Sequence, residues 1–177
     1  MKTKTPDSIH DGVLAFCAHI CAASSPVSVP VVPSRDSTVR ECFSNVARSV
    51  ERSGGSAVLG WAIWEVPGVF LEAEFHAVWD RPQQGLECVT RRDDADTSLV
   101  FLPDSGRRDA QPPLSNVRFS WPKNERISGL LRAIDEFDAF RVAHTDKVTK
   151  LLRAPRDKFE WYQMRAVAAH RLLFQRG

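Results

Sequence analysis

The chain has 177 residues, of which 43% are hydrophobic and 26% are charged, and its formal net charge is +2. These values are typical of one soluble globular domain that buries a single core without disulfides or metals. The net charge favours no class of partner. No apolar run approaches the ~18 residues needed to span a bilayer, so we expect no membrane-spanning segment.

The N-terminus loosely resembles a signal peptide, because Lys2 and Lys4 precede the apolar run VLAFCAHICAASS. Asp7, Asp11 and two histidines interrupt that pattern. We therefore expect a cytoplasmic protein. In a reducing cytoplasm cysteines stay free thiols, and the chain has four of them: Cys17, Cys21, Cys42 and Cys88.

The first part of the chain has two helical patterns on either side of a proline-rich segment. Apolar residues recur at helical spacing in SIHDGVLAFCAHICAASS (8–25) and in RDSTVRECFSNVARSVERSGG (35–55). Asp36, Ser37 and Thr38 offer N-caps for the second helix. The segment PVSVPVVP between them suits an edge strand or a polyproline entry segment.

Four strand patterns follow at 57–66, 68–79, 85–90 and 99–104, which suggests an antiparallel meander. The chain turns helical from about Asn124 and is interrupted at Pro155. We therefore predict an α+β fold in which an antiparallel sheet of about four to five strands packs on a Cys-bearing helix. One domain, 1–177, would hold an N-terminal helix (1–25), this core (26–104) and a C-terminal helical segment (120–177).

Cys42 and His76 are the candidate catalytic residues. Cys42 lies near the start of its predicted helix, where the helix dipole and a nearby imidazolium lower the pKa of a thiol. His76 lies in the middle of a strand, on the face opposite the more apolar one. A helix-borne cysteine followed by a strand-borne histidine is the layout of papain-like enzymes in the broad sense, such as transglutaminases, arylamine acetyltransferases and NlpC-type peptidases.

The block from ECFSNVARSV through GWAIWE and EAEFHAVW to GLECVT resembles a widespread bacterial family. That family has a Cys-Phe/His-x-Asn-Val helix, Gly-Trp-x-Ile-Trp-Glu, Glu-Ala-Glu-Phe-His-Ala-Val-Trp and Gly-x-Leu-x-Asp-Val-Thr-Pro, and some members carry a SEC-C metal-binding motif that this chain lacks. The resemblance covers about 26–104 and implies a papain-like architecture, with Cys42 and His76 as nucleophile and base. The other matching positions are Asn45, Gly60, Trp61, Trp64, Glu65, Glu72 and Glu74.

The chain departs from the family pattern at the position of the third catalytic group. Cys88 stands where the pattern has Asp, and Arg91 stands where it has Pro. In a Cys-His-Asp system the carboxylate orients the imidazole, which a thiol cannot do in the same way. If the two strands pair across the intervening loop, position 88 or 89 lies opposite His76. Three carboxylates are alternative orienting groups: Glu72, Glu74 and Glu87.

Metal binding is an alternative for two groups of residues, although we expect neither a metal nor a cofactor. Cys17 and Cys21 share one helical face near His19 and His10, but a core role explains cysteines on an apolar stripe. The set Cys42, His76 and Cys88 has no short ligand spacing. The chain has no Gly-rich phosphate loop and no Gly-x-Ser-x-Gly elbow.

The C-terminal segment 141–177 is basic and contains Phe159, Trp161 and Tyr162, a composition that can bind nucleic acid. The charges do not form one sharp stripe, so solvated helical faces are the preferred interpretation. Trp61 and Trp64 lie on opposite faces of one strand, and at least one of them is a candidate cleft residue.

The sequence thus favours thiol-dependent acyl chemistry. Cys42 would attack an amide, thioester or peptide carbonyl of an unknown small-molecule or peptide substrate, and His76 would move the proton. The alternative is a non-catalytic binding module on a degenerate papain-like scaffold. A buried Cys42 would favour this alternative.

Overall fold

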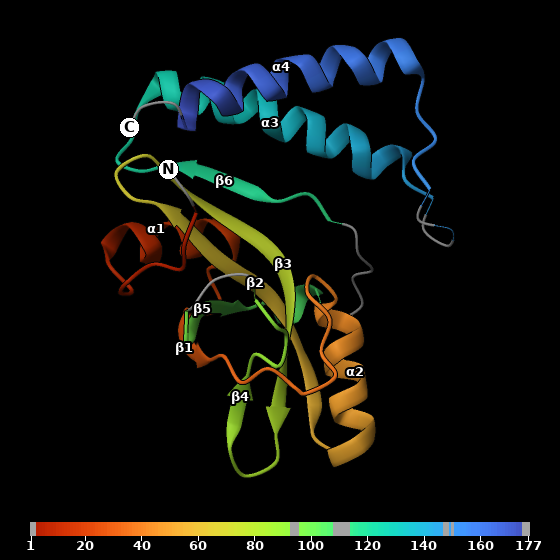
Figure 1. The fold of residues 1–177 in the computed structure, drawn as a ribbon. Helices are drawn as coiled ribbons and strands as arrows, with labels where there is room; N and C mark the ends of the chain where they lie inside the picture. The colour runs from red at the N-terminus through yellow and green to blue at the C-terminus, as the bar shows by residue number, and fades with distance from the viewer. Residues whose placement is uncertain (1–2, 93–95, 108–113, 147–148, 150, 175–177) are drawn as a thin grey trace. The chain divides into compact units, whose positions relative to one another are not determined.

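The computed structural model describes residues 3–92, 96–107, 114–146, 149 and 151–174. These residues form an α+β fold with four α-helices, one short 3-10 helix and a six-stranded antiparallel sheet (Figure 1). None of the described helices is long and apolar enough to cross a membrane.

The elements follow one another along the chain with these bounds: α1 Asp11–Ile20, β1 Val27–Pro30, α2 Cys42–Ser53, β2 Ser56–Val66, β3 Phe70–Arg81, β4 Gly85–Glu87, β5 Ser98–Pro103, η1 Ser105–Arg107, β6 Val117–Ser120, α3 Glu125–His144 and α4 Arg156–Phe174. The strand order is β1-β5-β2-β3-β4, and β6 pairs with β3. The predicted meander is therefore correct only from β2 to β4. The fourth predicted strand, β5, crosses back to lie between β1 and β2, and β6 was not predicted.

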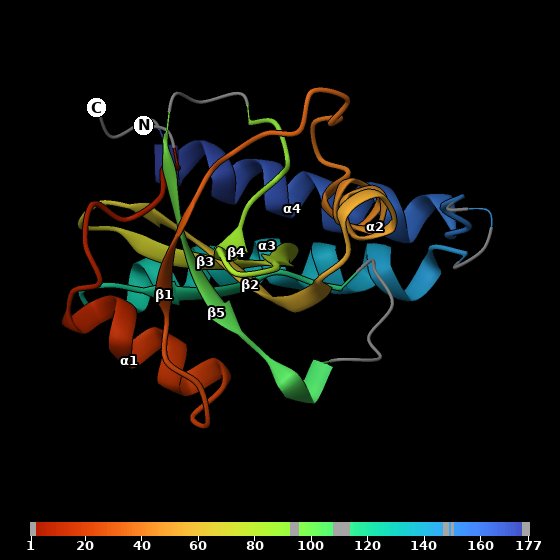
Figure 2. The same ribbon diagram turned by 90° about the horizontal axis from the view of Figure 1, so that it is seen from below.

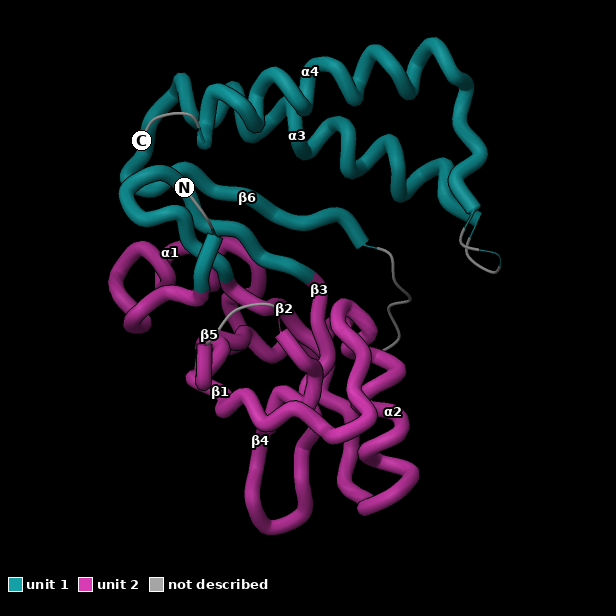
Figure 3. The backbone as a smooth tube through the Cα atoms, in the orientation of Figure 1, with its two compact units in different colours: residues 1–4, 64–74, 111–177 teal, residues 5–63, 75–110 magenta. Residues whose placement is uncertain are grey.

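The chain divides into two compact units (Figure 3). Unit 1 comprises residues 1–4, 64–74 and 111–177, and unit 2 comprises residues 5–63 and 75–110. Strands β2 and β3 therefore contribute residues to both units. The candidate catalytic residues belong to unit 2, and the C-terminal helices belong to unit 1.

In unit 2 the chain at the two outer strands of the sheet, β1 and β4, is joined by hydrogen bonds. β1 lies beside β5 in both views (Figures 1 and 2), with Val27 opposite Phe101 and Pro30 opposite Ser98. The chain after β1 then pairs in parallel with the chain after β4. The Cys88 N–H donates to the Pro30 carbonyl, and the Val32 N–H donates to the Cys88 carbonyl, both over 2.9 Å. The prolines fit because this pairing uses the carbonyl of Pro30 and needs no N–H from it.

Helix α2 packs its apolar stripe on the sheet of unit 2. Val46 forms a buried cluster with Ala77, Trp79 and Val89, and the Phe43 ring lies 5.6 Å from the Phe75 ring between centroids. The predicted packing of the sheet on the Cys-bearing helix is thus present. Burial of such side chains stabilises the unit by roughly 1.5–3 kcal/mol for each large apolar residue.

Helix α2 begins later than predicted, at Cys42. The predicted residues do not cap the helix, because the side chain of Asn45 hydrogen-bonds to the backbone of Thr38. Asn45 Oδ1 accepts from the Thr38 N–H, and Asn45 Nδ2 donates to the Thr38 carbonyl. Arg40 then adopts a left-handed φ of 65°, which helical backbone excludes. Residues before Glu41 are held as a turn, so Cys42 is the first residue of the helix.

Unit 1 is built on the antiparallel pair of α3 and α4. Val66 and Phe70 form a buried cluster with Ile127, Leu131 and Leu173. Asn124 caps α3 by accepting from the backbone N–H groups of its first turn.

Unit 1 also contains a partly buried charge cluster, which we call the Arg118 cluster. The Arg118 side chain is 9% exposed and contacts three carboxylates: Glu72 at 2.7 Å, Asp135 at 2.7 Å and Asp138 at 2.8 Å. β6 carries Arg118 and pairs with β3 so that Glu72 lies opposite Arg118. The missed strand is therefore also the element that supplies this guanidinium.

Candidate functional site

The structure places Cys42 at the first position of α2, with the side chain facing the core. Cys42 is 7% exposed, and it shares the buried stripe of the helix with Asn45, Val46 and Ser49. Asn45 also donates to Thr90 Oγ1 over 3.1 Å. This stripe holds the start of α2 against the turn before it and the strand end beyond β4.

His76 points to the other side of β3. Helix α2 packs on Phe75, Ala77 and Trp79, and side chains alternate along a strand. His76 Nε2 instead lies 3.5 Å from Cys88 Sγ. The structure thus brings the side chains of His76 and Cys88 together on the face away from α2. The expected register is wrong, however: Glu87 lies opposite Trp79, so neither position 88 nor position 89 lies directly opposite His76.

The environment of His76 makes it a weak base. Burial lowers the pKa of His76 to about 4, and the positive charge of Arg92 lowers it further in the same direction. The Arg92 side chain is 9% exposed and pairs with Asp96 at 3.3 Å. The imidazole is consequently neutral at pH 7. A general base works best when its pKa lies near the working pH, and this one lies well below it.

The partner thiol is inaccessible from solvent. Cys88 is 1% exposed, and its backbone is fixed by the hydrogen bonds to the segment after β1. All four cysteines are thiols without a disulfide. Burial raises the pKa of Cys17 to about 12, which suits the core role weighed for it in the sequence.

The other candidate orienting and cleft residues have structural partners. Glu72 belongs to the Arg118 cluster, Glu74 accepts from Trp64 Nε1 over 3.0 Å, and Glu87 pairs with Arg81 at 3.2 Å. Trp61 is 3% exposed and donates to Asp104 Oδ2 over 3.0 Å. Cys88 is thus the orienting candidate that contacts His76.

The residues weighed for metal and nucleic-acid binding are placed as follows. Within the described part of the chain, no group of three or more His, Cys, Asp or Glu side chains is arranged to hold a metal ion. His10 accepts from the Gly12 N–H and caps α1. In unit 1, Phe159 packs on Phe137 and Tyr162 stacks on Phe140, while Trp161 is 50% exposed beneath the Arg165 guanidinium.

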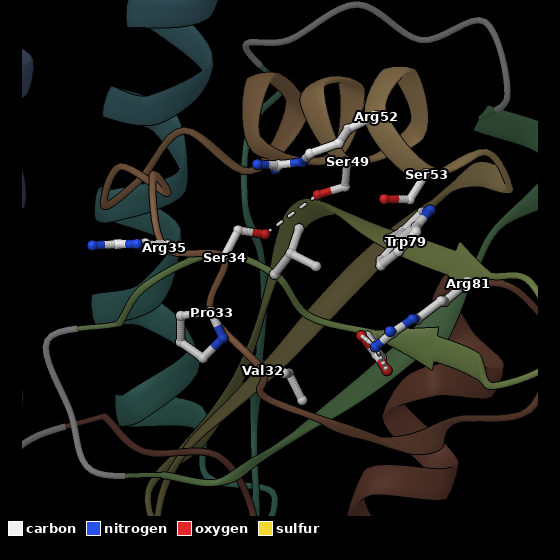
Figure 4. A pocket seen from close by; sticks show the side chains of 11 residues that line it. Val32, Pro33, Ser34, Arg35, Ser49, Arg52, Ser53, Trp79 and Arg81 are labelled. Atoms are coloured by element: carbon white, nitrogen blue, oxygen red, sulfur yellow. Dashed lines mark hydrogen bonds and ion pairs between the residues drawn. The ribbon is translucent and has the colours of Figure 1, made fainter.

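A second site, which sequence reasoning missed, opens between α2, the β3–β4 hairpin and the segment after β1 (Figure 4). We call it the basic pocket. It has a volume of about 240 Å³. Its polar lining consists of three arginines, three serines and one carboxylate: Arg35, Arg52, Arg81, Ser34, Ser49, Ser53 and Glu87. Trp79, Val32 and Val89 contribute apolar surface.

The charges of the basic pocket are only partly compensated within it. Arg81 pairs with Glu87 and lies over the Trp79 ring, 5.4 Å from its centroid. Arg52 pairs with Asp36 at 3.3 Å, but both side chains are about half exposed. A backbone hydrogen bond lowers the pKa of Asp36 most strongly, and the positive charges of Arg52 and Arg48 lower it further, against an opposing effect of desolvation. Exposed pairs of this kind are weak and exchange partners readily.

The serines lie between the arginines. Ser34 Oγ and Ser49 Oγ are 3.4 Å apart across the pocket, and Ser49 donates to the Asn45 carbonyl over 3.1 Å (Figure 4). The three arginines come from separate segments of the chain, so no local sequence motif predicts that they line one pocket. The one local signal is that Ser49, Arg52 and Ser53 share a helical face at i, i+3 and i+4.

Comparisons with family models, curated proteins and solved structures find no match to this chain. The resemblance to the bacterial family stays a prediction from the sequence. Two arrangements in unit 2 bear on function: the His76–Cys88 contact and the basic pocket.

Proposed function

We propose that the protein is a non-catalytic binding module on a papain-like scaffold, and that it binds a small ligand with a phosphate or carboxylate group. The observation that supports this function is the basic pocket of unit 2. Guanidinium groups and hydroxyls are the side chains that recognise phosphate and carboxylate oxygens, because they donate charge-assisted hydrogen bonds.

The size and the charge of the pocket agree with this ligand class. A volume of about 240 Å³ suits a small molecule. Three arginines face one carboxylate, Glu87, which already pairs with Arg81. A bound anion therefore gains attraction from Arg35, and from Arg52 in competition with its exposed pair to Asp36, while the Arg81–Glu87 pair stays intact.

The state of the predicted catalytic pair supports binding over catalysis. Cys42 is packed in the core, and the neutral His76 lies on the other face of β3 from α2. A Cys-His mechanism needs the imidazole to take the proton of the attacking thiol, within about 3 Å of it. The thiol that His76 contacts is instead that of the buried Cys88.

The test of this function is a calorimetric titration at low ionic strength with inorganic phosphate in one arm and succinate in the other. We expect Arg52→Gln to weaken binding of the preferred anion about ten-fold, the equivalent of one charge-assisted hydrogen bond. Arg91→Gln removes the same charge from an exposed position of unit 2 outside the pocket and should leave the affinity unchanged. Equal losses in both variants, or no binding of either anion to the wild type, would contradict the proposal.

Thiol-dependent acyl chemistry is the second candidate, favoured by the position of Cys42 as the first residue of α2. The positive end of the helix dipole favours a thiolate there. In this case Cys42 would attack the carbonyl of an amide, thioester or peptide bond, and a backbone N–H of the first turn would stabilise the oxyanion.

Alkylation rates separate the two candidate functions. For a binding module we expect iodoacetamide at neutral pH to modify the half-buried Cys21 first, then Cys42, with Cys17 slowest because its pKa of about 12 leaves almost no thiolate. Peptide mass spectrometry over a time course measures each site. If Cys42 reacted fastest despite its burial, its thiolate would be activated and acyl chemistry would replace binding as the preferred function.

A further inference from the structure

Unit 1 contains a cavity of its own, of about 380 Å³, which we call the Glu72 cavity. It is independent of the basic pocket, since all its lining residues belong to unit 1. Its wall combines aromatic and aliphatic side chains with one ion pair: Phe70, Ile134, His170, Phe174, Glu72 and Arg118. This volume accommodates a ring-sized molecule.

The apolar part of the wall is rigidly packed. The Phe70 and Phe174 rings meet edge to face with centroids 6.0 Å apart, and the His170 ring stacks on Phe174 at 4.3 Å. Phe70 is anchored in the buried cluster with Leu131 and Leu173. The cavity therefore offers a preformed aromatic surface to an apolar ligand body.

The polar end of the cavity is formed by the carboxylate of Glu72. Glu72 Oε1 accepts from Asn116 Nδ2 and pairs with Arg118 Nη2, each over 2.7 Å. The second oxygen, Oε2, receives no hydrogen bond from any residue in the described ranges. The Glu72 side chain is 15% exposed and lines the cavity, which places its carboxylate within reach of a ligand donor.

The charge around that acceptor is negative. The Arg118 cluster sets three carboxylates against one guanidinium, and Arg141 approaches Asp138 only to 3.9 Å with a side chain that is 55% exposed. The excess negative charge affects the pKa of Asp135. Burial raises this pKa most, and the charges of Asp138 and Glu72 raise it as well, whereas Arg118 lowers it. A cation is the ligand group that relieves this excess.

We propose that the Glu72 cavity binds a small amine, with its ammonium group at Glu72 Oε2 and its apolar or aromatic body against Phe70 and Phe174. An anionic ligand does not fit, because the guanidinium of Arg118 is already engaged by three carboxylates. A neutral ligand gains only the apolar contacts. The ammonium gains a charge-assisted hydrogen bond and the attraction of the aromatic faces.

Three matched probes test the charge requirement: benzylamine, benzyl alcohol and benzoate, titrated into the full chain and followed by NMR. They share one ring and differ in the charge of the side group. We expect benzylamine to bind at least about ten-fold more tightly than benzyl alcohol, and benzoate to bind most weakly, since one charge-assisted hydrogen bond is at stake. Equal affinities for the three probes, or no benzylamine binding, would overturn the proposal.

Two variants locate the site. Glu72→Gln should weaken benzylamine binding about ten-fold and leave benzyl alcohol unaffected. Its matched control is Glu74→Gln, an exposed carboxylate on the same face of β3 that bonds to Trp64 instead. Because Glu72 also supports Arg118, Ile134→Trp provides a second measurement that leaves the carboxylate in place and fills the cavity. Benzylamine binding that survives Ile134→Trp in a folded protein would place the amine elsewhere and refute this site.

Discussion

We expect replacement of Arg118 by methionine to destabilise the protein by about 3 kcal/mol, the low end of the cost of breaking a buried ion pair, because Arg118 is 9% exposed but its three carboxylates are 15–38% exposed. Methionine keeps an unbranched apolar stem but has no charge, so we expect the loss of charge to dominate over the loss of packing. Glu72, Asp135 and Asp138 then repel one another around an apolar side chain. Urea denaturation at pH 7 measures the change in the free energy of unfolding.

The control for this prediction is Arg165→Met. Arg165 also contacts a carboxylate, Glu136 at 2.6 Å, but its side chain is 39% exposed. A pair at that exposure contributes about 1 kcal/mol or less. Acid should partly rescue Arg118→Met, because protonation of the three carboxylates removes their repulsion. Equal costs in the two arginine variants at pH 7 would mean that the Arg118 cluster adds no more than a surface pair.

Acidification from pH 6.5 to pH 4 removes roughly 3 kcal/mol of stability through His76 alone. Burial holds the pKa of His76 at about 4 in the folded protein, below the ordinary value of 6.5. Between these two values the unfolded chain binds a proton that the folded protein does not bind. Stability from this group is therefore full above pH 6.5 and is lost as the pH falls towards 4.

The measurement is a series of urea unfolding curves at several pH values for the wild type and for His76→Gln, which cannot titrate in this range. We expect the two curves of stability against pH to converge as the pH falls. His19→Gln, at an exposed position of α1, should keep the slope of the wild type. A wild-type slope that persists in His76→Gln would show that His76 titrates normally and is not desolvated.

The helices were the most predictable part of the fold, because their signals are local. Helix α3 begins at Glu125, next to the expected start at about Asn124, and the apolar stripe of α2 faces the core. The start of α2 was misplaced because Asn45 bonds back to Thr38 with both polar atoms of its side chain, an interaction that cap rules based on Asp36 to Thr38 do not anticipate. A side chain inside the helix decided where the helix begins.

The order of the strands could be predicted only in part, because part of it depends on long-range pairing. The β2–β3–β4 order follows from short connections, whereas the position of β5 between β1 and β2 depends on pairings between distant segments. The segment VRFS alternates apolar and polar residues but is only four residues long, too short a pattern to have been recognised as β6. The pairing of β3 with β4 was expected from the short loop between them, but its register, with Glu87 opposite Trp79, and the burial that lowers the pKa of His76 were not.

The two proposed binding sites were beyond sequence analysis for the same reason. Arg35, Arg52 and Arg81 come from a loop, a helix and a strand, and each one alone reads as an ordinary solvated charge. Glu72 was considered as an orienting group for His76, and only the pairing of β6 with β3 shows that its partner is Arg118. Sites assembled from distant segments become visible only when the fold is known.

The hydrogen bonds between the chain after β1 and the chain after β4 have a consequence for self-association. An open sheet presents unpaired N–H and C=O groups at its outer strands, and these groups template the addition of strands from other molecules. In unit 2 the Pro30 carbonyl and the backbone of Cys88 are already paired with each other. Growth of an intermolecular sheet at this place would first require that closure to open, so the joined ends protect the protein against aggregation while it stays folded.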